Sequence, residues 1–365
     1  MKFSINQSEL NHALSIVSKV PTNNSTLAVL SGVHIKATDT QVILETTNLV
    51  LSIKHTVSAL VEEPGEAVVP TKLFLDIIKS LPDMAVRIEN EQNTVSIFCN
   101  NISYSLRSMD PADFPAFPEI QTSQEASFPF DVFSSMVKAT AKIVGRDESR
   151  IALTGVLINQ EGDTLRMVAT DSYRLAVSDA KLETSTSEPF EALLDGKFLQ
   201  NIAALGQSEE NIIIGMNENQ VIIRYQETSF INRKIEAAYP NYKQLISTDY
   251  KTKVTLPTQS LIDAVRRMAL LSNSVTPVQI MVDAEGGVIS LVTASHDVGN
   301  AQETIICSIE GDSVEVSFNH GYLLDGLSSV KSETIDLQLF GPMKPGILRA
   351  TEEEDFLYLI MPVRV

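Results

Sequence analysis

Short runs of alternating or β-branched apolar residues dominate the chain and predict a protein rich in strands. Examples that are bounded by Asn, Asp, Gly or Glu turns are residues 42–44, 86–88, 95–98, 212–214, 221–223, 288–291 and 314–316. Six segments place apolar residues at helical spacing instead: residues 8–17, 71–81, 133–144, 196–205, 258–271 and 320–330. Ser8 is the candidate N-cap of the first helix. Short helices scattered among many strands predict an α+β fold, with the helices on one face of antiparallel sheets.

The order of these elements repeats about every 125 residues. Strands that begin near Phe3, Phe128 and Val254 each precede a helix, and each unit contains a second strand-then-helix step. The repeat predicts three domains, each made of two similar halves with a strand, a helix and further strands. Because a proline-rich joint at residues 109–118 and a polar joint near residues 239–251 separate the units, we place the domains at residues 1–122, 123–249 and 250–365.

Length and composition limit the class of protein. A chain of 365 residues suits two or three domains, and 44% hydrophobic residues is too high a share for a disordered chain. No apolar run approaches the ~20 residues that a membrane span requires, and the N-terminus becomes polar too early for a signal peptide. With only Cys99 and Cys307, a disulfide framework is not expected, which favours a reducing cytoplasm.

Charge is distributed unevenly along the chain. The formal net charge of −18 by itself disfavours nucleic acid as a partner. The six helical segments with their flanks nevertheless carry a net +4, so the remaining residues carry −22. Lys and Arg are good helix formers, which is one sufficient explanation of this bias. The other is that repeated helices present one mildly basic surface to phosphates while the rest of the protein repels them.

Signatures of catalysis are missing from the sequence. It contains neither a Gly-x-x-x-x-Gly-Lys-Ser/Thr motif nor a Gly-x-Ser-x-Gly motif, and none of its five histidines forms a His-x-x-x-His pair. Acidic pairs such as Asp147-Glu148 are typical of solvated turns. We therefore predict no catalytic residue, no metal site and no cofactor.

Two stretches combine apolar and polar residues in a pattern that suggests recognition. Residues 169–175 (Ala-Thr-Asp-Ser-Tyr-Arg-Leu) form a turn that enters a strand, and a simple explanation is that Asp171 caps neighbouring amides. Residues 358–365 (Tyr-Leu-Ile-Met-Pro-Val-Arg-Val) are apolar almost to the last residue. A final core strand accounts for Leu359, whereas residues 361–363 suit an exposed apolar groove.

These two stretches belong to a set of motifs that runs through the whole chain in order. The motifs are residues 1–3, 66–72, 112–115, 168–177, 239–242, 318–325, 342–345 and 358–364. The Ala-Thr-Asp-x-x-Arg-Leu motif together with the terminal Met-Pro-x-Arg is highly specific. With these motifs the chain resembles the β subunit of bacterial DNA polymerase III, the β sliding clamp family.

The resemblance implies a processivity factor without catalysis of its own. Three clamp domains would form half of a head-to-tail homodimeric ring around duplex DNA, with polymerase activity residing in partner subunits. Twelve helices at about 10 Å spacing would surround a hole on the order of 28 Å across. The implied partners are duplex DNA, a second copy of the chain and, through short clamp-binding motifs, the polymerase III alpha subunit, the clamp loader and repair proteins. No membrane is implied.

The resemblance also implies site residues. Six basic residues are expected to face DNA: Lys72, Lys138, Lys142, Arg146, Arg150 and Lys197. The peptide-binding groove between the second and third domains would be lined by Leu153, Thr170, Tyr173, Arg174, Leu175, Pro240, Leu245, Asn319, Tyr322, Met343, Pro345, Leu359, Ile360, Met361, Pro362, Val363 and Arg364. Ring closure would use Tyr104 and Leu106 of one chain and Leu270 and Leu271 of the other, although core burial explains these four residues equally well. The chain departs from the family pattern at Asn24, Ser172, Gln244 and Val365.

Two other functions stay open from the sequence. One is an enzyme with an acidic site on an α+β scaffold, and the missing set of converging acid, base and nucleophile disfavours it. The other is a repeat scaffold that binds proteins only, and the basic bias of the helices disfavours that.

Overall fold

The computed structural model describes residues 1–20, 27–183, 185, 188–206, 209–247, 249–271, 277–295, 299–351 and 355–364. The chain divides into two compact units. Unit 1 contains residues 1–130 and 205–234, and unit 2 contains residues 131–204 and 235–365. The three expected domains with boundaries near residues 122 and 249 stay a prediction.

All six predicted helices are present. Their bounds are α1 (Gln7–Val17), α2 (Thr71–Ser80), α3 (Phe130–Thr140), α4 (Gly196–Ala203), α5 (Thr258–Ala269) and α6 (His320–Leu327). The N-cap of α1 is Asn6, so the assignment of Ser8 was wrong. Asn6 keeps an extended backbone, and its side chain accepts a hydrogen bond from the Ser8 N–H at 3.0 Å.

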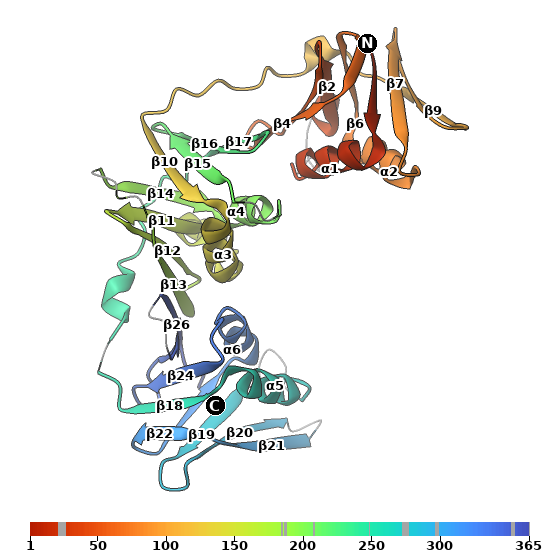
Figure 1. The fold of residues 1–365 in the computed structure, drawn as a ribbon. Helices are drawn as coiled ribbons and strands as arrows, with labels where there is room; N and C mark the ends of the chain where they lie inside the picture. The colour runs from red at the N-terminus through yellow and green to blue at the C-terminus, as the bar shows by residue number, and fades with distance from the viewer. Residues whose placement is uncertain are drawn as a thin grey trace. The chain divides into compact units, whose positions relative to one another are not determined.

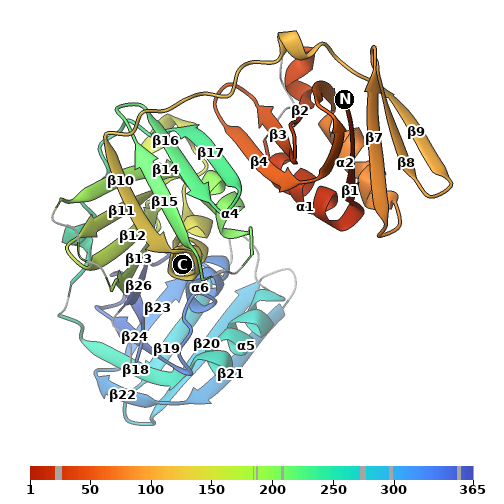
Figure 2. The ribbon, with the colours of Figure 1, turned by 45° about the horizontal axis from the view of Figure 1, so that its top comes forward.

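Unit 1 combines two antiparallel sheets with α1 and α2. The first sheet has the order β5-β1-β7-β8-β9, and the second has the order β10-β15-β16-β17-β4-β3-β2-β6. Figure 2 shows β10, β15, β16 and β17 side by side. The strands are β1 (Lys2–Asn6), β2 (Gly32–Ala37), β3 (Gln41–Thr47), β4 (Ser52–Ser58), β5 (Leu60–Glu63), β6 (Gly65–Pro70), β7 (Ala85–Glu91), β8 (Thr94–Cys99), β9 (Ile102–Arg107), β10 (Gln124–Pro129), β15 (Asn211–Met216), β16 (Gln220–Tyr225) and β17 (Thr228–Arg233), with 3-10 turns η1 (Ala28–Ser31) and η2 (Pro111–Asp113).

The helices of unit 1 pack through the faces that their sequences predict. Leu10, Leu14 and Val17 of α1 are fully buried, as are Phe74 and Ile78 of α2. The two helices also contact each other. Burying side chains of this size contributes about 1.5–3 kcal/mol each to folding, which outweighs the weak intrinsic stability of helices this short.

Unit 2 has a nine-stranded antiparallel sheet, β14-β11-β12-β13-β26-β25-β24-β18-β22, and a four-stranded sheet, β21-β20-β19-β23. Helices α3, α4, α5 and α6 lie on the same side of the nine-stranded sheet (Figure 1). The strands are β11 (Gly155–Glu161), β12 (Thr164–Thr170), β13 (Arg174–Lys181), β14 (Phe190–Asp195), β18 (Thr252–Pro257), β19 (Val278–Asp283), β20 (Val288–Ser295), β21 (Gly299–Ile306), β22 (Ser308–Gly311), β23 (Val314–Phe318), β24 (Thr334–Leu339), β25 (Gly346–Ala350) and β26 (Phe356–Ile360), with 3-10 turns η3 (Ala141–Ile143), η4 (Glu148–Thr154) and η5 (Tyr242–Leu245).

Strand β26, which ends five residues before the C-terminus, has an internal place in the nine-stranded sheet. It pairs with β13 from Arg174 opposite Ile360 to Ser178 opposite Phe356. Its other neighbour is β25. The pairing brings the two motifs that the sequence singled out, residues 169–175 and 358–364, to the same place.

Two expectations from composition can be checked against the structure. Cys99 and Cys307 are both free thiols. In the described part of the chain, no helix is both long and apolar enough to cross a membrane.

Candidate functional site

The turn between β12 and β13 is held by its own side chains. The Asp171 carboxylate accepts hydrogen bonds from the backbone N–H groups of Tyr173 (2.9 Å) and Arg174 (3.1 Å), which confirms its role as a cap. The Thr170 hydroxyl accepts a third from the Ser172 N–H at 3.2 Å. Ser172 has a φ of +80°, in the left-handed region that favours glycine. The turn leaves 59% of the Tyr173 surface exposed.

Arg174 connects this turn to helix α6 and strand β26. Its guanidinium donates to the carboxylates of Asp171, at 2.9 Å, and Asp325, and to the Tyr358 hydroxyl at 3.4 Å. It also lies 4.3 Å from the centre of the Tyr322 ring. Burial opposes the charge, but Tyr358 and Asp325 outweigh it and raise the pKa of Arg174. Because a buried cation is costly without partners, these contacts lock β13 to α6 and β26.

Three members of this network, Asp171, Asp325 and Tyr358, were not among the predicted site residues, although Asp171 was expected to cap the turn. Tyr322 and Asp325 are three residues apart on α6, so helical spacing places them on the same face, and that signal was available in the sequence. The Tyr358 hydroxyl donates to the Tyr322 carbonyl at 2.8 Å. Only the packing of α6 against β26 reveals that contact.

Several predicted groove residues form an exposed apolar rim. Tyr173, Leu245, Met343 and Met361 are 59%, 55%, 55% and 40% exposed. The ring centres of Tyr173 and Tyr322 lie 6.4 Å apart, with the ring planes inclined by 29°. Pro240 and Arg364 are also exposed, whereas the partly exposed members are Asn319, Tyr322, Pro345, Pro362 and Val363.

The other predicted groove residues are buried and support the rim from below. They are Leu153, Thr170, Arg174, Leu175, Leu359 and Ile360. Leu175 and Leu359 belong to a core cluster that includes Val168, Tyr242 and Phe340.

Backbone hydrogen bonds hold the residues that follow β26. The Met361 N–H donates to the Tyr173 carbonyl at 2.9 Å, and the Val363 N–H donates to the Ser317 carbonyl at 2.8 Å. At the N-terminus of α6, the Asn319 side chain accepts from the Tyr322 N–H at 3.0 Å. These bonds fix residues 361–363 between the Tyr173 turn and the end of β23.

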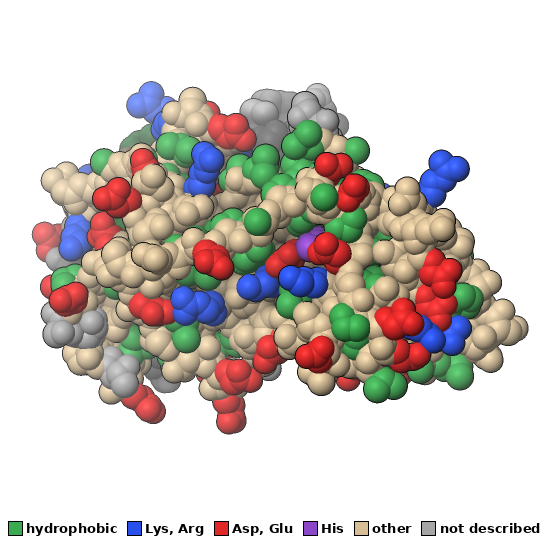
Figure 3. Space-filling model, turned by 90° about the horizontal axis from the view of Figure 1, so that it is seen from above, with side chains coloured by type: hydrophobic (Ala, Val, Ile, Leu, Met, Phe, Trp, Pro, Cys, Tyr) green, Lys and Arg blue, Asp and Glu red, His purple; other side chains and the backbone are tan. Residues whose placement is uncertain are grey.

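The basic residues predicted to face DNA are mostly exposed. Lys72, Lys138, Arg146, Arg150 and Lys197 have exposed side chains. Lys142 is different, because its Nζ donates to the Ser328 hydroxyl at 2.8 Å and burial lowers its pKa. Arg150 lies 3.9 Å from the carboxylate of Asp147. The face seen in Figure 3 carries both basic and acidic side chains, interspersed with each other.

The residues predicted for ring closure differ in exposure. Leu270 and Tyr104 are 82% and 39% exposed, and Leu271 is partly exposed. Leu106 is buried at 8%, which suits a core residue. The sequence did not single out Leu73 on α2 and Ile306 on β21, which are 49% and 84% exposed.

The departures from the family pattern are only partly visible. Gln244 lies exposed in η5, and Ser172 occupies the left-handed position of the turn. Asn24 and Val365 lie outside the described residues.

Comparison with known families matches three consecutive segments of the chain. The N-terminal, central and C-terminal domains of the DNA polymerase III beta subunit match residues 1–118, 127–241 and 243–364. The chain belongs to the DNA polymerase III beta subunit family.

Individual relatives agree with this family. The beta sliding clamp of Streptomyces coelicolor is 30% identical, and the alignment covers 100% of both chains. The crystal structure of the DNA polymerase sliding clamp from Bacillus subtilis matches with a TM-score of 0.93 at 28% identity, over 100% of this chain and 99% of that one. The polymerase beta subunit of Streptococcus pyogenes matches with a TM-score of 0.92 at 29% identity, over 100% of both chains.

Membership in the beta subunit family decides between the functions left open by the sequence. The chain is a DNA sliding clamp, a processivity factor without catalysis of its own, built from three clamp domains. This sets aside both the enzyme with an acidic site and the scaffold that binds proteins only.

Proposed function

We propose that two copies of this chain close head to tail into a ring around duplex DNA, and that partner proteins dock on the ring through the apolar rim around Tyr173. The observation that carries the docking function is that rim itself. Tyr173, Met343 and Met361 are large and exposed, and Arg174 with its two carboxylate partners holds the turn beneath them. Exposed apolar side chains on a rigid base are the usual anchors of peptide recognition.

The partners follow from this chemistry. Short segments with Gln, Leu and Phe or Leu anchors, carried by the polymerase III alpha subunit, the clamp loader and repair proteins, would bury the rim on docking. Met343 and Met361 suit several different partners, because methionine side chains adapt their shape at low energetic cost. The two free thiols agree with a place in the cytoplasm.

Ring closure is supported by two unfilled sheet edges. β9 ends the five-stranded sheet of unit 1, and β21 ends the four-stranded sheet of unit 2. Pairing β9 of one copy with β21 of the other would satisfy both edges and cover Tyr104 and Ile306.

Contact with DNA would be electrostatic and loose. Lys72, Lys138, Arg146 and Lys197 are exposed on or beside helices and suit phosphates, whereas Lys142 is held by Ser328. A few dispersed positive charges attract DNA without fixing a register, which permits sliding.

The test of this function uses the topology of the DNA. The purified protein, placed on nicked circular duplex by a clamp loader, should remain bound during gel filtration and be lost once the DNA is linearised. Retention on both forms, or on neither, would contradict a ring.

The docking role has a separate test. A peptide with Gln, Leu and Phe anchors should bind the wild-type protein, and deletion of residues 361–365 should abolish this binding while the solution mass stays at twice 40.0 kDa. Peptide affinity that survives the deletion would refute the rim as the docking site.

A further inference from the structure

We propose that a trough along strand β23 receives an extended segment of the docked peptide, which adds to the free edge of β23 and carries basic side chains. The inference rests on the proposed docking function and deepens it, because it adds a second contact and a side-chain chemistry to partner recognition.

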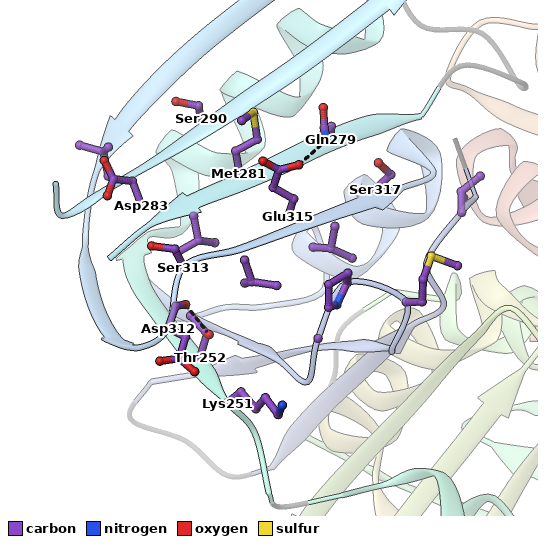
Figure 4. A pocket seen from close by; sticks show the side chains of 18 residues that line it. Lys251, Thr252, Gln279, Met281, Asp283, Ser290, Asp312, Ser313, Glu315 and Ser317 are labelled. Atoms are coloured by element: carbon purple, nitrogen blue, oxygen red, sulfur yellow. Dashed lines mark hydrogen bonds between the residues drawn. The ribbon is translucent and has the colours of Figure 1, made fainter. Parts of the chain in front are cut away.

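The trough is a cavity of about 890 Å³ in unit 2. Its floor is the outer face of β19, β20 and β23, where Gln279, Met281 and Glu315 point into it (Figure 4). Its far wall is formed by residues 341–343 together with Val363. Met343 and Val363 also belong to the predicted docking groove, so the trough continues directly from it.

The edge of β23 beside the trough is open for pairing. β23 is the last strand of its sheet and, among the residues that the structure describes, pairs only with β19, with Ser317 opposite Gln279 and Glu315 opposite Met281. The Val363 N–H already donates to the Ser317 carbonyl on the other side. Because backbone groups alternate along a strand, the N–H and C=O of Glu315 face the same side as the Ser317 carbonyl. The hydrogen bond from Val363 to Ser317 is therefore the first one along this edge of β23, and an added peptide segment could form the next ones with Glu315.

The charges around the trough select the chemistry of that segment. Its lining contains three carboxylates, Asp283, Asp312 and Glu315, against one ammonium group, Lys251. All four side chains are exposed, and Glu315 accepts a hydrogen bond from Gln279 at 3.3 Å. The excess of negative charge favours Lys and Arg in the added segment and repels phosphates. A peptide with an apolar anchor and a basic flank fits both parts of the surface.

The experiment measures the affinity of synthetic peptides for the full-length protein by fluorescence anisotropy. One peptide carries the anchor alone, and two others add a flank of alternating Lys and Ser at the N- or C-terminal end. A further pair has Glu in place of Lys. One of the two Lys-flanked peptides should bind about fivefold to tenfold tighter than the anchor, and the gain should shrink in high salt. The Glu flank at the same end should give no gain.

Matched variants locate the effect. Glu315→Lys should remove the gain from the Lys flank while leaving the affinity of the anchor peptide unchanged, which also shows that the protein is folded. Glu161→Lys changes another exposed carboxylate, at the end of β11, and should leave the gain intact. N-methylation of alternate amides in the flank should abolish the gain without changing its charge.

Each outcome decides the proposal. Equal affinity of the anchor and both Lys-flanked peptides, a gain that persists in Glu315→Lys, or a gain that survives N-methylation at both sets of alternate amides would each overturn strand addition at β23. Failure of the anchor peptide to bind the wild-type protein would refute the docking function itself. This outcome is distinguishable from a failure of strand addition, because the anchor peptide carries no flank.

Discussion

The turn at Asp171 shows how far single residues determine local structure. The same arrangement recurs in unit 1, where the N–H groups of Val50 and Leu51 donate to the Asn48 side chain at 3.0 and 2.8 Å. Leu49 has a φ of +70° there, close to the +80° of Ser172. In both turns the side-chain acceptors satisfy the backbone N–H groups locally, which accounts for their shared conformation. The two turns differ in the residue that follows them, because the turn at Asp171 leads into an arginine with carboxylate partners and the turn at Asn48 leads into Leu51.

Ser172 provides a prediction at this scale. Its left-handed backbone costs a side-chain residue about 1–2 kcal/mol, and the greater freedom of glycine in the unfolded chain offsets about 0.5–1 kcal/mol. Ser172→Gly should therefore raise the free energy of unfolding by up to about 1 kcal/mol, measured by denaturant titration. Ser96→Gly, in the regular strand β8, should lower it, and a loss of stability in both variants would contradict the argument.

Asp325 provides a second prediction. Asp325→Asn removes one of two carboxylate partners from the buried Arg174 and should lower the free energy of unfolding by about 1–2 kcal/mol, with weaker binding of the anchor peptide. Asp325 is partly exposed, so the cost stays below that of an unpaired buried charge. The matched control is Asp263→Asn, which breaks an exposed ion pair with Arg266 at 3.6 Å and should cost less than about 0.5 kcal/mol. Equal losses in the two variants would show that Arg174 does not depend on Asp325.

At the scale of elements, strand pairing joins segments that are far apart in the sequence. β4 pairs with β17, with His55 opposite Thr228, and β13 pairs with β26 in the corresponding way in unit 2. The His55 Nδ1 lies 2.8 Å from the Thr228 hydroxyl, and the His12 ring lies 6.3 Å from that of His55. Burial, together with His12, lowers the pKa of His55 to about 4. At neutral pH the His55 side chain is therefore uncharged where β4 and β17 meet.

This lowered pKa predicts a pH dependence. In the unfolded chain His55 binds a proton near pH 6.5, whereas in the folded protein it does so only near pH 4, so the unfolded state is favoured as the pH falls between these values. After allowance for partial exposure, about 1–2 kcal/mol of stability should be lost between pH 7 and pH 4 through this residue. His55→Gln keeps a hydrogen-bonding side chain without a titrating ring and should show a smaller loss over that range. A pH profile identical to that of the wild-type protein would exclude His55 as a source.

At the scale of the whole molecule, the informative features are the sheet edges and apolar side chains that a single chain leaves exposed. β9 and β21 are terminal strands of their sheets, and exposed apolar residues lie on or near them, with Leu270 and Ile306 82% and 84% exposed. Apolar side chains with this much surface in water are costly to leave uncovered. A second copy would cover them, and the same face would be excluded from other proteins.

Ile306 tests the assembly. Ile306→Arg should convert a particle of about twice 40.0 kDa into one of 40.0 kDa by light scattering, because a buried unpaired cation opposes association. Leu60→Arg changes another exposed apolar residue, 71% exposed on the edge strand β5, and should leave the mass unchanged. An unaltered mass for Ile306→Arg, or dissociation of both variants, would contradict pairing at β21.

The sequence predicted local structure well where the local pattern decides it. The apolar spacing of Leu10, Leu14 and Val17 predicted a helix with a buried face, and the position of Asp171 predicted a capped turn. The N-cap of α1 was misplaced by two residues, since Asn6 and Ser8 are both good caps and only the backbone shows which one keeps an extended conformation. The groove residues came from motifs of a known family rather than from pattern alone.

What the sequence alone determined is therefore the set of elements, their repetition and the separation of charge between helices and the rest, because these depend on residues close together in the chain. Only the tertiary structure decided that Arg174 meets Asp325, that β26 lies beside β13, that Lys142 is held by Ser328, and that β23 keeps an open edge. Each of these contacts joins residues that distant strand pairings and helix packing bring together, and the free energy of such long-range pairing leaves no mark on the local sequence.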